Sequence, residues 1–517
     1  MSQRYDVIVI GGGLGGLTAA GLLARSGRKV LLLERNDSVG GAATTYKAGD
    51  LVVEASLHET ADPHDPVEPK HQVLSRLGVL DAVQWVPTGP LYEVRGGPVG
   101  EPFQLPEGFA AARAALGDRF PAARGGIADV LGDMEKIATS LGVLSRRREA
   151  FRDPREGFGA LLKLGPMLRD WRRTAAEVFT RSFGDNEALK WALAANLAYY
   201  HDDPETLWWI FFAVAQGGYL ASGSRYVRGG SQRLSEALAA KIGAAGGEIR
   251  TGRIATEIRL NAGGRPAAVV HTDKRGGDRE EALTRAVAGN AAPAVLGAML
   301  MEPARERFLG AYAGRRLSIS LFSIMLGLSR RPSEFGIRSY SSFLLPRWIK
   351  QLTDFRQCAG FLGAAAAGAP APLLTVVDYS AIDSGFEGPP YPVSVVGLDR
   401  VENWAGLDKA DYDARRKQWL DRIVGVVDGE FPGFGSHVVA SQFSTAHSIA
   451  RYLNAPSGAI YGFAPLPPTG PIWRGPGRSA NTPVPGLYLA SAYASSGGFT
   501  GAIMGGAAAA ERILAEP

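Results

Sequence analysis

A glycine-rich stretch near the start of the chain, G-G-G-L-G-G, has the spacing of a turn that binds phosphate through its backbone. Gly11 allows the tight turn, Gly13 lets the backbone approach a pyrophosphate, and Gly16 lets a helix lie close to a sheet. A helix beginning at Leu14 would direct unpaired N–H groups and the positive end of its dipole at the phosphates. Glu34 follows at a spacing that lets a carboxylate accept both hydroxyls of an adenosine ribose. These residues predict a dinucleotide-binding site.

The elements that must position these residues are a strand, a helix and a second strand. Residues 5–10 and 29–33 are apolar runs typical of buried parallel strands, and residues 14–26 carry apolar side chains at helical spacing. Gly27 follows the helix, where a glycine commonly caps the C-terminus. Because the strand, the helix, the second strand and the acid follow one another at the expected spacing, the glycines predict a dinucleotide-binding turn rather than a glycine-rich turn that occurs by chance.

A second glycine pair behind the acid indicates FAD rather than a nicotinamide dinucleotide. Arg35 precedes Gly40, Gly41 and Ala42. In FAD enzymes such a loop folds back over the pyrophosphate, so that its amides and the arginine contact the anion. A nicotinamide-binding domain has no need of this loop.

Another strand, glycine turn and helix occur near the end of the chain. Residues 485–491 are predicted to form the strand and residues 502–514 the helix. This arrangement would place a second helix N-terminus beside a polar ligand. The residues that we predict to contact FAD here are Ser491, Gly498, Thr500 and Gly501.

Together these segments resemble the phytoene desaturase-like flavoproteins, which include carotenoid desaturases, carotenoid isomerases and retinol saturases and are more distantly related to amine oxidases. The resemblance extends over nearly the whole chain. It is carried by the N-terminal glycines with their second loop, by residues 228–238 and 246–250, by A-P-S-G-A-I-Y-G at 455–462, and by T-P-V-P-G-L-Y-L-A at 482–490 continuing through Gly501.

Two positions depart from the family pattern. Amine oxidases end the C-terminal strand in a glycine and an acid that bonds the flavin ribityl chain, whereas this chain has Ser491 and Ala492. The desaturase-like branch often lacks that acid, so FAD binding is still expected and an amine oxidase is less expected. Many desaturases carry His-Pro where this chain has Ser495 and Ser496, so the resemblance implies no particular desaturase activity.

The resemblance implies an α/β fold with a discontinuous Rossmann-like FAD-binding domain and a mixed α+β substrate-binding domain. A chain of 517 residues suits two domains. The expected FAD-binding domain takes residues 1–70, 225–293 and 471–517, and the substrate-binding domain takes residues 71–224 and 294–470.

The middle segment of the FAD-binding domain is expected to contain a helix and two strands. Residues 231–245 have helical spacing, and residues 248–260 and 267–272 alternate like strands. In flavoproteins of this type the first of these strands presents a small apolar residue to the adenine, and Ile254 is the matching position.

An apolar segment, L-W-W-I-F-F-A-V-A at residues 207–215, is the strongest hydrophobic feature of the expected substrate domain. It is shorter than the ~18 apolar residues that cross a bilayer. It could line an apolar tunnel, dip into one leaflet or form a buried helix. Residues 184–197 predict a further helix nearby, and Trp191, Tyr199 and Tyr200 add aromatic side chains. A long isoprenoid substrate would need such a lining.

The composition limits the possible partners and compartments. The single Cys358 excludes an internal disulfide, a dithiol redox pair and a cysteine zinc site, so we predict noncovalent FAD and a reducing cytoplasm, with a peripheral membrane position as the alternative. The chain opens directly into a strand with no signal peptide. A net charge of +5 without a basic, aromatic-rich block argues against nucleic acid as a partner.

Residues 58–71 are rich in histidines and carboxylates, which invites a metal hypothesis. Pro63, Pro66 and Pro69 prevent a helix that would align ligands, and no H-E-x-x-H motif occurs. We therefore predict no metal, and instead a solvated loop or polar residues near the flavin. The absence of G-x-S-x-G leaves no basis for a serine hydrolase.

Flavin chemistry requires few protein side chains, because the isoalloxazine itself carries hydride or electrons. His58, Tyr461 and His447 are the candidate pocket residues, each more expected to be structural than catalytic. We expect hydride transfer between flavin and a substrate carbon without a side-chain nucleophile.

The predicted function is that of an FAD-dependent oxidoreductase that desaturates, saturates or isomerises C=C bonds of a lipophilic polyene or isoprenoid. A desaturase would need an external acceptor, a quinone or oxygen. One alternative is an amine or alcohol oxidase acting on a natural-product intermediate. Another is a non-catalytic protein that holds a prenyl chain, as Rab GDP-dissociation inhibitors do on a related fold, although the intact glycines and Glu34 disfavour it.

Overall fold

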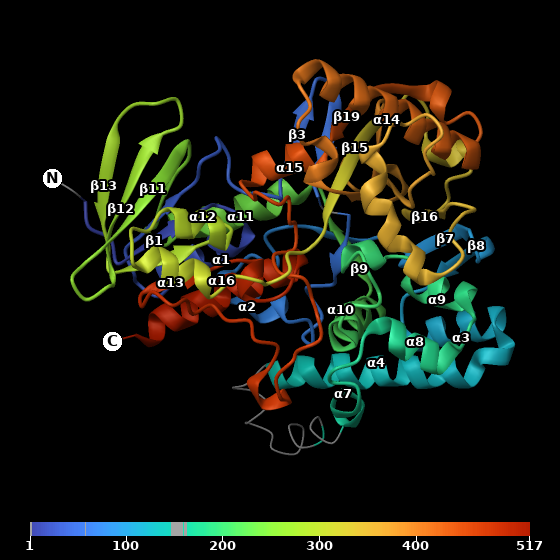
Figure 1. The fold of residues 1–517 in the computed structure, drawn as a ribbon, viewed down its shortest axis with the longest axis horizontal. Coiled ribbons are helices and arrows are strands. Elements are labelled where there is room, and N and C mark those ends of the chain that lie inside the picture. The colour runs from blue at the N-terminus through green and yellow to red at the C-terminus, as the bar shows by residue number, and fades with distance from the viewer. Residues whose placement is uncertain (1–2, 57, 146–158, 160–162, 517) are drawn as a thin grey trace.

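The computed structural model describes residues 3–56, 58–145, 159 and 163–516. Two larger sheets organise the chain, one five-stranded and parallel and the other seven-stranded with strands of mixed direction (Figure 1). Residues from both sheets line one large cavity. The predicted α/β fold, with a Rossmann-like sheet and a mixed α+β part, is confirmed.

The parallel sheet has the strand order β10-β2-β1-β14-β20. The strands β1 and β2 are buried over their whole length, as expected of apolar strands covered on both faces. The sheet therefore draws on three segments that are far apart in the sequence, while the exact domain boundaries stay a prediction. The bounds are β1 Val7–Ile10, β2 Val30–Leu33, β10 Glu248–Arg250, β14 Ala286–Gly289 and β20 Leu487–Leu489.

Four helices pack beside this sheet. Helix α1 (Leu14–Arg25) connects β1 to β2 and contacts α11 (Ser231–Ala244), α16 (Gly498–Ala515) and α2 (Lys70–Leu77). Helix α16 begins at Gly498 instead of the predicted residue 502. The sequence analysis assigned the first turn of this helix to the glycine-rich loop, because glycine is a weak helix former.

The predicted strand over residues 248–260 is in fact two strands that belong to different sheets. After β10 the chain turns at Thr251 and Gly252, and the backbone N–H of Arg253 donates to the carbonyl of Glu34. The second piece, β11 (Arg253–Leu260), forms an antiparallel three-stranded sheet with two further strands. These are β12 Pro266–Asp273 and β13 Arg279–Leu283.

The larger sheet has the order β19-β15-β18-β17-β16-β7-β8, with β16 and β7 parallel and the other pairs antiparallel. Helix α14 (Lys409–Glu430) packs Trp419, Ile423 and Val427 into a core with its central strands. The strand bounds are β7 Tyr92–Gly96, β8 Gly100–Leu105, β15 Ser320–Leu328, β16 Ser341–Leu345, β17 Leu374–Asp378, β18 Tyr391–Asp399 and β19 Val438–Ser444.

A group of helices forms a separate hydrophobic core with residues from strands β7, β8 and β16, and lies below that sheet in Figure 1. The helix predicted over residues 184–197 is shorter, because the Asn186 side chain caps it by accepting from the N–H of Leu189. No described helix is long and apolar enough to cross a membrane. The bounds are α3 Phe109–Arg119, α4 Arg124–Ser145, α7 Gly165–Arg169, α8 Ala175–Phe183, α9 Glu187–Ala194 and α10 Trp209–Ser222.

Short elements connect these parts. Strand β9 pairs with both β5 and β6, and β3 pairs with β4. The bounds are β3 Thr45–Ala48, β4 Leu51–Glu54, β5 Thr60–Ala61, β6 Trp85–Pro87, β9 Ser224–Val227, α12 Pro293–Ala298, α13 Ala304–Gly310 and α15 Ala446–Leu453.

Helices α1 and α16 approach each other through glycines. A Cβ atom added at Gly506 would lie 2.1 Å from the carbonyl oxygen of Gly15, and one added at Gly15 would lie 2.1 Å from the carbonyl oxygen of Ala490. A side chain at Gly506 would push α16 away from α1, and one at Gly15 would push α1 away from the residue that follows β20, because in each case backbone atoms would have to move.

We predict that Gly506→Ala lowers the free energy of unfolding by about 1–3 kcal/mol, the usual cost of overpacking a tight contact. The matched control is Gly425→Ala in the exposed middle of α14, where an added Cβ meets no atom within 4 Å. That control should be neutral or stabilising by up to ~1 kcal/mol, because alanine is the better helix former. Urea unfolding of both variants measures the difference, and equal stabilities would contradict the contact.

Candidate functional site

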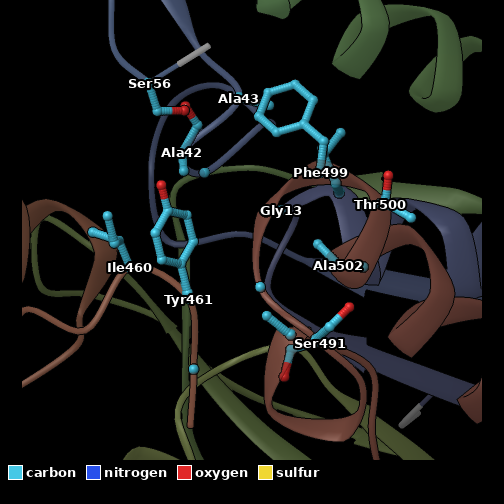
Figure 2. Close-up of a pocket in the computed structure, with 18 of the residues that line it drawn as sticks. Gly13, Ala42, Ala43, Ser56, Ile460, Tyr461, Ser491, Phe499, Thr500 and Ala502 are labelled. Carbon is cyan, nitrogen blue, oxygen red and sulfur yellow. The ribbon is translucent and has the colours of Figure 1, made fainter. Parts of the chain in front are cut away.

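One cavity of about 1650 Å³ extends between the parallel sheet, the larger sheet and the helical region. Its lining includes the ends of β1 and β2, the start of α16, the exposed side of α10 and residues of β15. Figure 2 shows Tyr461 pointing across the cavity toward Ala42 and Ser56, while Phe499 and Thr500 stand on the other side. The cavity has a polar end and an apolar end.

Glu34 marks the polar end, at the C-terminus of β2. Its carboxylate accepts the backbone N–H of Gly12 at 2.6 Å and that of Asn36 at 2.8 Å. Burial raises the pKa of Glu34, and these two hydrogen bonds oppose the shift. The carboxylate is held rigidly at the cavity wall, where it can accept ribose hydroxyls.

The glycine turn that precedes α1 has the conformation the phosphate-binding role requires. Gly11 has φ +98°, a region that favours glycine, and a Cβ at Gly16 would lie 2.0 Å from the carbonyl oxygen of Gly11. Gly16 therefore acts through packing and does not line the cavity, whereas Gly11, Gly13 and Leu14 do.

Two helices begin at the cavity without a side-chain cap. The N-cap residues are Gly13 for α1 and Gly497 for α16. Uncapped N–H groups and the positive dipole ends of two helices favour an anionic ligand between them.

The predicted second loop lies against the first. The N–H of Gly40 donates to the carbonyl of Gly12 at 2.8 Å, and a Cβ at Gly41 would lie 3.2 Å from the Cα of Gly13. Arg35, Gly40, Gly41 and Ala42 all line the cavity. This loop is thus placed to contact the same anion.

The C-terminal candidates lie on the opposite wall. Ser491, Gly498 and Thr500 line the cavity, and the buried hydroxyl of Ser491 has no hydrogen-bond partner among the described residues. Gly501 does not line it; a Cβ there would lie 1.7 Å from the carbonyl oxygen of Ser496, so this glycine shapes the turn. An unsatisfied buried hydroxyl at a cavity wall is a further sign of a polar ligand.

Ile254 lies at the far side of the polar end, beside Arg253 and Lys274, which also line the cavity. Its side chain is 37% exposed, unusual for isoleucine. An adenine ring covering it would remove this apolar surface from water.

The apolar end is built from α4, α7, α10 and residues near Ile472. Its lining side chains are apolar or aromatic: Leu141, Met167, Trp171, Trp208, Ile210, Phe211, Val214 and Ile472. Residues 207–215 include no exposed side chain; Trp209 and Phe212 are core, while Phe211 and Val214 face the cavity. The segment is therefore both core and cavity wall.

Two of the three candidate pocket residues meet at the cavity. His58 and Tyr461 line it, and burial lowers the pKa of His58 to about 4, so its imidazole is neutral at physiological pH. The third candidate, His447, lies elsewhere. It is absent from the described lining, and its ring contacts that of Tyr412 on α14 with centroids 5.9 Å apart. Helix α15 turns the next two residues, Ser448 and Ile449, toward the cavity instead.

A buried group beside Thr500 was not predicted from the sequence. Lys70 donates to Glu68 Oε1 at 2.7 Å and to Thr500 Oγ1 at 3.1 Å, and Thr500 donates to Glu68 at 2.8 Å. Burial lowers the pKa of Lys70 while Glu68 opposes the shift. The dense run of charges between residues 58 and 71 was the available signal. In the described part of the chain no group of three or more potential ligands is placed to hold a metal ion.

Comparison with known proteins identifies the family. Residues 14–314 match the family described as flavin containing amine oxidoreductase. The chain belongs to this family. It is also 24% identical to the all-trans-retinol 13,14-reductases of Macaca fascicularis and Homo sapiens, over 99% of this chain and 86% of each relative. These relatives confirm the predicted resemblance, which included retinol saturases.

Solved structures of other flavin oxidoreductases share the fold of this family member. An oxidoreductase from Methanosarcina mazei matches 98% of this chain and 100% of its own with a TM-score of 0.62 and 17% identity. Cyclohexylamine oxidase from Brevibacterium oxydans matches 99% of both chains with a TM-score of 0.58 and 15% identity. The protein is an FAD-dependent oxidoreductase. The uncapped helix termini, the fixed carboxylate of Glu34 and the unpartnered Ser491 hydroxyl fit that cofactor.

We predict that Glu34→Gln lowers FAD affinity ten- to a hundredfold, because a charge-assisted hydrogen bond to the ribose is worth about 1.5–3 kcal/mol. Titrating the apoprotein with FAD by fluorescence measures the change. Glu257→Gln on β11, a carboxylate outside the cavity lining, serves as the control. Unchanged affinity in Glu34→Gln would contradict the assignment of the ribose to this residue.

FAD should be bound noncovalently. Cys358 is fully buried in the helical core, burial raises the pKa of its thiol to about 12, and it is not among the described residues that line the cavity. Acid precipitation should therefore release all of the yellow cofactor into the supernatant. Flavin that stays with the protein pellet would refute this prediction.

Proposed function

We propose that this protein adds hydrogen across a C=C bond of a lipophilic polyene, with retinoids as the first substrate class to test. The observation that carries the proposal is the continuity of one cavity from the FAD-binding end into an apolar end walled by α4, α7 and α10. Its volume of about 1650 Å³ exceeds the ~300–1,000 Å³ of a typical ligand pocket, which leaves room for a second ligand beside FAD. The retinol 13,14-reductases, similar over 99% of this chain, support the same substrate class.

Bound FAD supplies the capacity to donate or accept a hydride and electrons. The protein's own part is to hold the polyene against it and to exclude water. Phe211, Val214 and Trp171 provide an apolar wall, because α10 and the segment between α7 and α8 bring these side chains to the cavity. His58 is neutral there, so the junction between the two ends carries no histidine charge that would disfavour a hydrocarbon.

We further propose the domain division expected from the sequence, with residues 1–70, 225–293 and 471–517 holding FAD and residues 71–224 and 294–470 holding the substrate. The positions of the strands support this division. Each strand of the parallel sheet falls in the residues assigned to FAD, and each strand of the seven-stranded sheet falls in the residues assigned to the substrate.

The protein reduced anaerobically with dithionite should be reoxidised by all-trans-retinol, with return of the oxidised flavin band and a product two hydrogens heavier by mass spectrometry. A geometric isomer formed without flavin oxidation would contradict saturation and support an isomerase. If the reduced flavin is reoxidised only by the oxidation product of an amine or an alcohol, and not by a polyene, the result would support an oxidase instead.

The path of the substrate is tested by Phe211→Glu, with Phe211→Leu as the matched control. A buried charge in the apolar wall should slow reoxidation by retinol at least about tenfold. Reoxidation by oxygen, which does not need that wall, should be unchanged in both variants. Equal slowing with both oxidants would show damage to the FAD site rather than to the path.

A further inference from the structure

Glu59 is a buried carboxyl group in the wall of the cavity. It lies directly before β5, is 9% exposed, and follows His58 in the chain. The hydroxyl of Thr88 donates to its Oε2 at 3.5 Å, which is long for such a bond, and hydrogen bonds with the Ser224 and Tyr199 hydroxyls also favour its anion. No described lysine, arginine or histidine forms an ion pair with it.

The other carboxylates of the cavity lining have stronger hydrogen-bond donors than Glu59 has. Each accepts from backbone N–H groups, from a cation or from several side chains: Glu34 from Gly12 and Asn36, Asp37 from Lys274, Glu54 from Thr45, Tyr226 and Ser231, Asp65 from Val67, and Glu68 from Lys70 and Thr500. Glu59 differs from these neighbours because its partners in the described structure are hydroxyl groups alone, with no cation and no backbone N–H group to offset the desolvation of a negative charge.

The surroundings of Glu59 are aromatic and hydroxylic. Tyr219 donates to the backbone carbonyl of Glu59 at 3.2 Å, and the ring of Tyr199 lies 6.0 Å from that of His58. Behind the carboxyl, the Thr88 and Ser224 hydroxyls hydrogen-bond to each other. Burial raises the pKa of Glu59 to about 8, with a smaller contribution from the charge of Glu107. The group is thus a neutral acid at pH 7.

Glu59 also lies where the polar and apolar ends of the cavity meet. His58, Tyr199 and Tyr461 line the cavity with it, and a Cβ at Gly497, the N-cap of α16, would lie 2.5 Å from the Cβ of Tyr461. The wall that carries Glu59 therefore continues into the loop that begins the C-terminal FAD-binding helix.

We propose that Glu59 is the proton donor for the reduction of the C=C bond, an inference that rests on the proposed function. Saturation of C=C requires a hydride at one carbon and a proton at the other. The hydride comes from reduced FAD, the π bond breaks, and the O–H bond of Glu59 breaks as a new C–H bond forms. The resulting carboxylate accepts from Thr88 and regains its proton from solvent, so that two electrons and two hydrogens are transferred in total.

The protonation state is tested without substrate, on the FAD-bound protein. Glu59→Gln resembles a neutral acid in shape, so it should fold, retain FAD and keep its thermal midpoint at pH 7. Glu68→Gln, the matched control in the same wall, removes the partner of buried Lys70 and should lower the midpoint.

The pH dependence of stability gives a second readout. The folded protein holds the Glu59 proton up to pH about 8, whereas the unfolded chain releases it near 4.5. Wild-type stability should therefore fall relative to Glu59→Gln as pH rises between these values. In the folded protein His58 and the tyrosines that face Glu59 do not titrate in this window, since burial lowers the pKa of His58 to about 4 and raises those of Tyr199 and Tyr219 well above 10. The unfolded chain protonates His58 near 6.5, but this contribution is the same in wild type and Glu59→Gln and cancels in the comparison.

Catalysis is tested by single turnover of dithionite-reduced protein with all-trans-retinol. Glu59→Gln should slow reoxidation by about 10²–10⁴-fold, the usual contribution of a general acid, with FAD content unchanged. Glu59→Asp should recover part of the rate. The wild-type rate should fall as pH rises through about 8, where the acid loses its proton, and Glu59→Gln should lose this dependence.

Each result of these experiments either supports or overturns the assignment of Glu59 as the proton donor. A wild-type rate in Glu59→Gln would overturn the assignment while leaving polyene reduction in place. Unfolding or loss of FAD in Glu59→Gln would also overturn it, because a neutral acid should tolerate the amide. If wild-type reduced protein is not reoxidised by any polyene, the proposed function fails first and the donor assignment with it.

Discussion

The contact between α1 and α16 at Gly15 and Gly506 is the constraint on which the cofactor end depends. The two helices arise from opposite ends of the sequence, and the absence of side chains at this point lets their backbones touch. Their close approach brings two uncapped N-termini to the same cavity. A single helix end attracts an anion only modestly, whereas two ends that converge on one point form a site that a diphosphate can bridge.

Beyond that site the lining of the cavity changes from polar to apolar side chains. At its polar end, backbone N–H groups and a lysine donate hydrogen bonds to carboxylates, and its far end is walled by aromatic and aliphatic side chains. Between them lie His58, Glu59 and Tyr199, which are ionisable groups that burial keeps neutral at pH 7. A neutral junction lets a hydrocarbon lie close to the cofactor without a charge being desolvated on its arrival.

The elements that could be predicted from the sequence are those whose local residue pattern corresponds to a single structure. The glycine turn, α1, β2 and Glu34 could be predicted because their spacing is set by backbone geometry within a short stretch. Patterns that depend on distant contacts were less informative. The alternation across residues 248–260 could not reveal the turn at Gly252, since each half pairs with a different sheet. His447 and Glu59 illustrate the same limit: only the tertiary packing shows which of them faces the cavity.

The strand order of the parallel sheet has a consequence for the growing polypeptide. β20 is the last strand of the chain, and it pairs with β14, while α16 follows it and supplies one wall of the cavity. During synthesis β1, α1 and β2 can form before β20 and α16 are made, and until then α1 exposes the apolar face that α16 covers. The cavity wall that α16 supplies is therefore complete only after α16 has been synthesised, and before that point the uncovered face of α1 is open to aggregation.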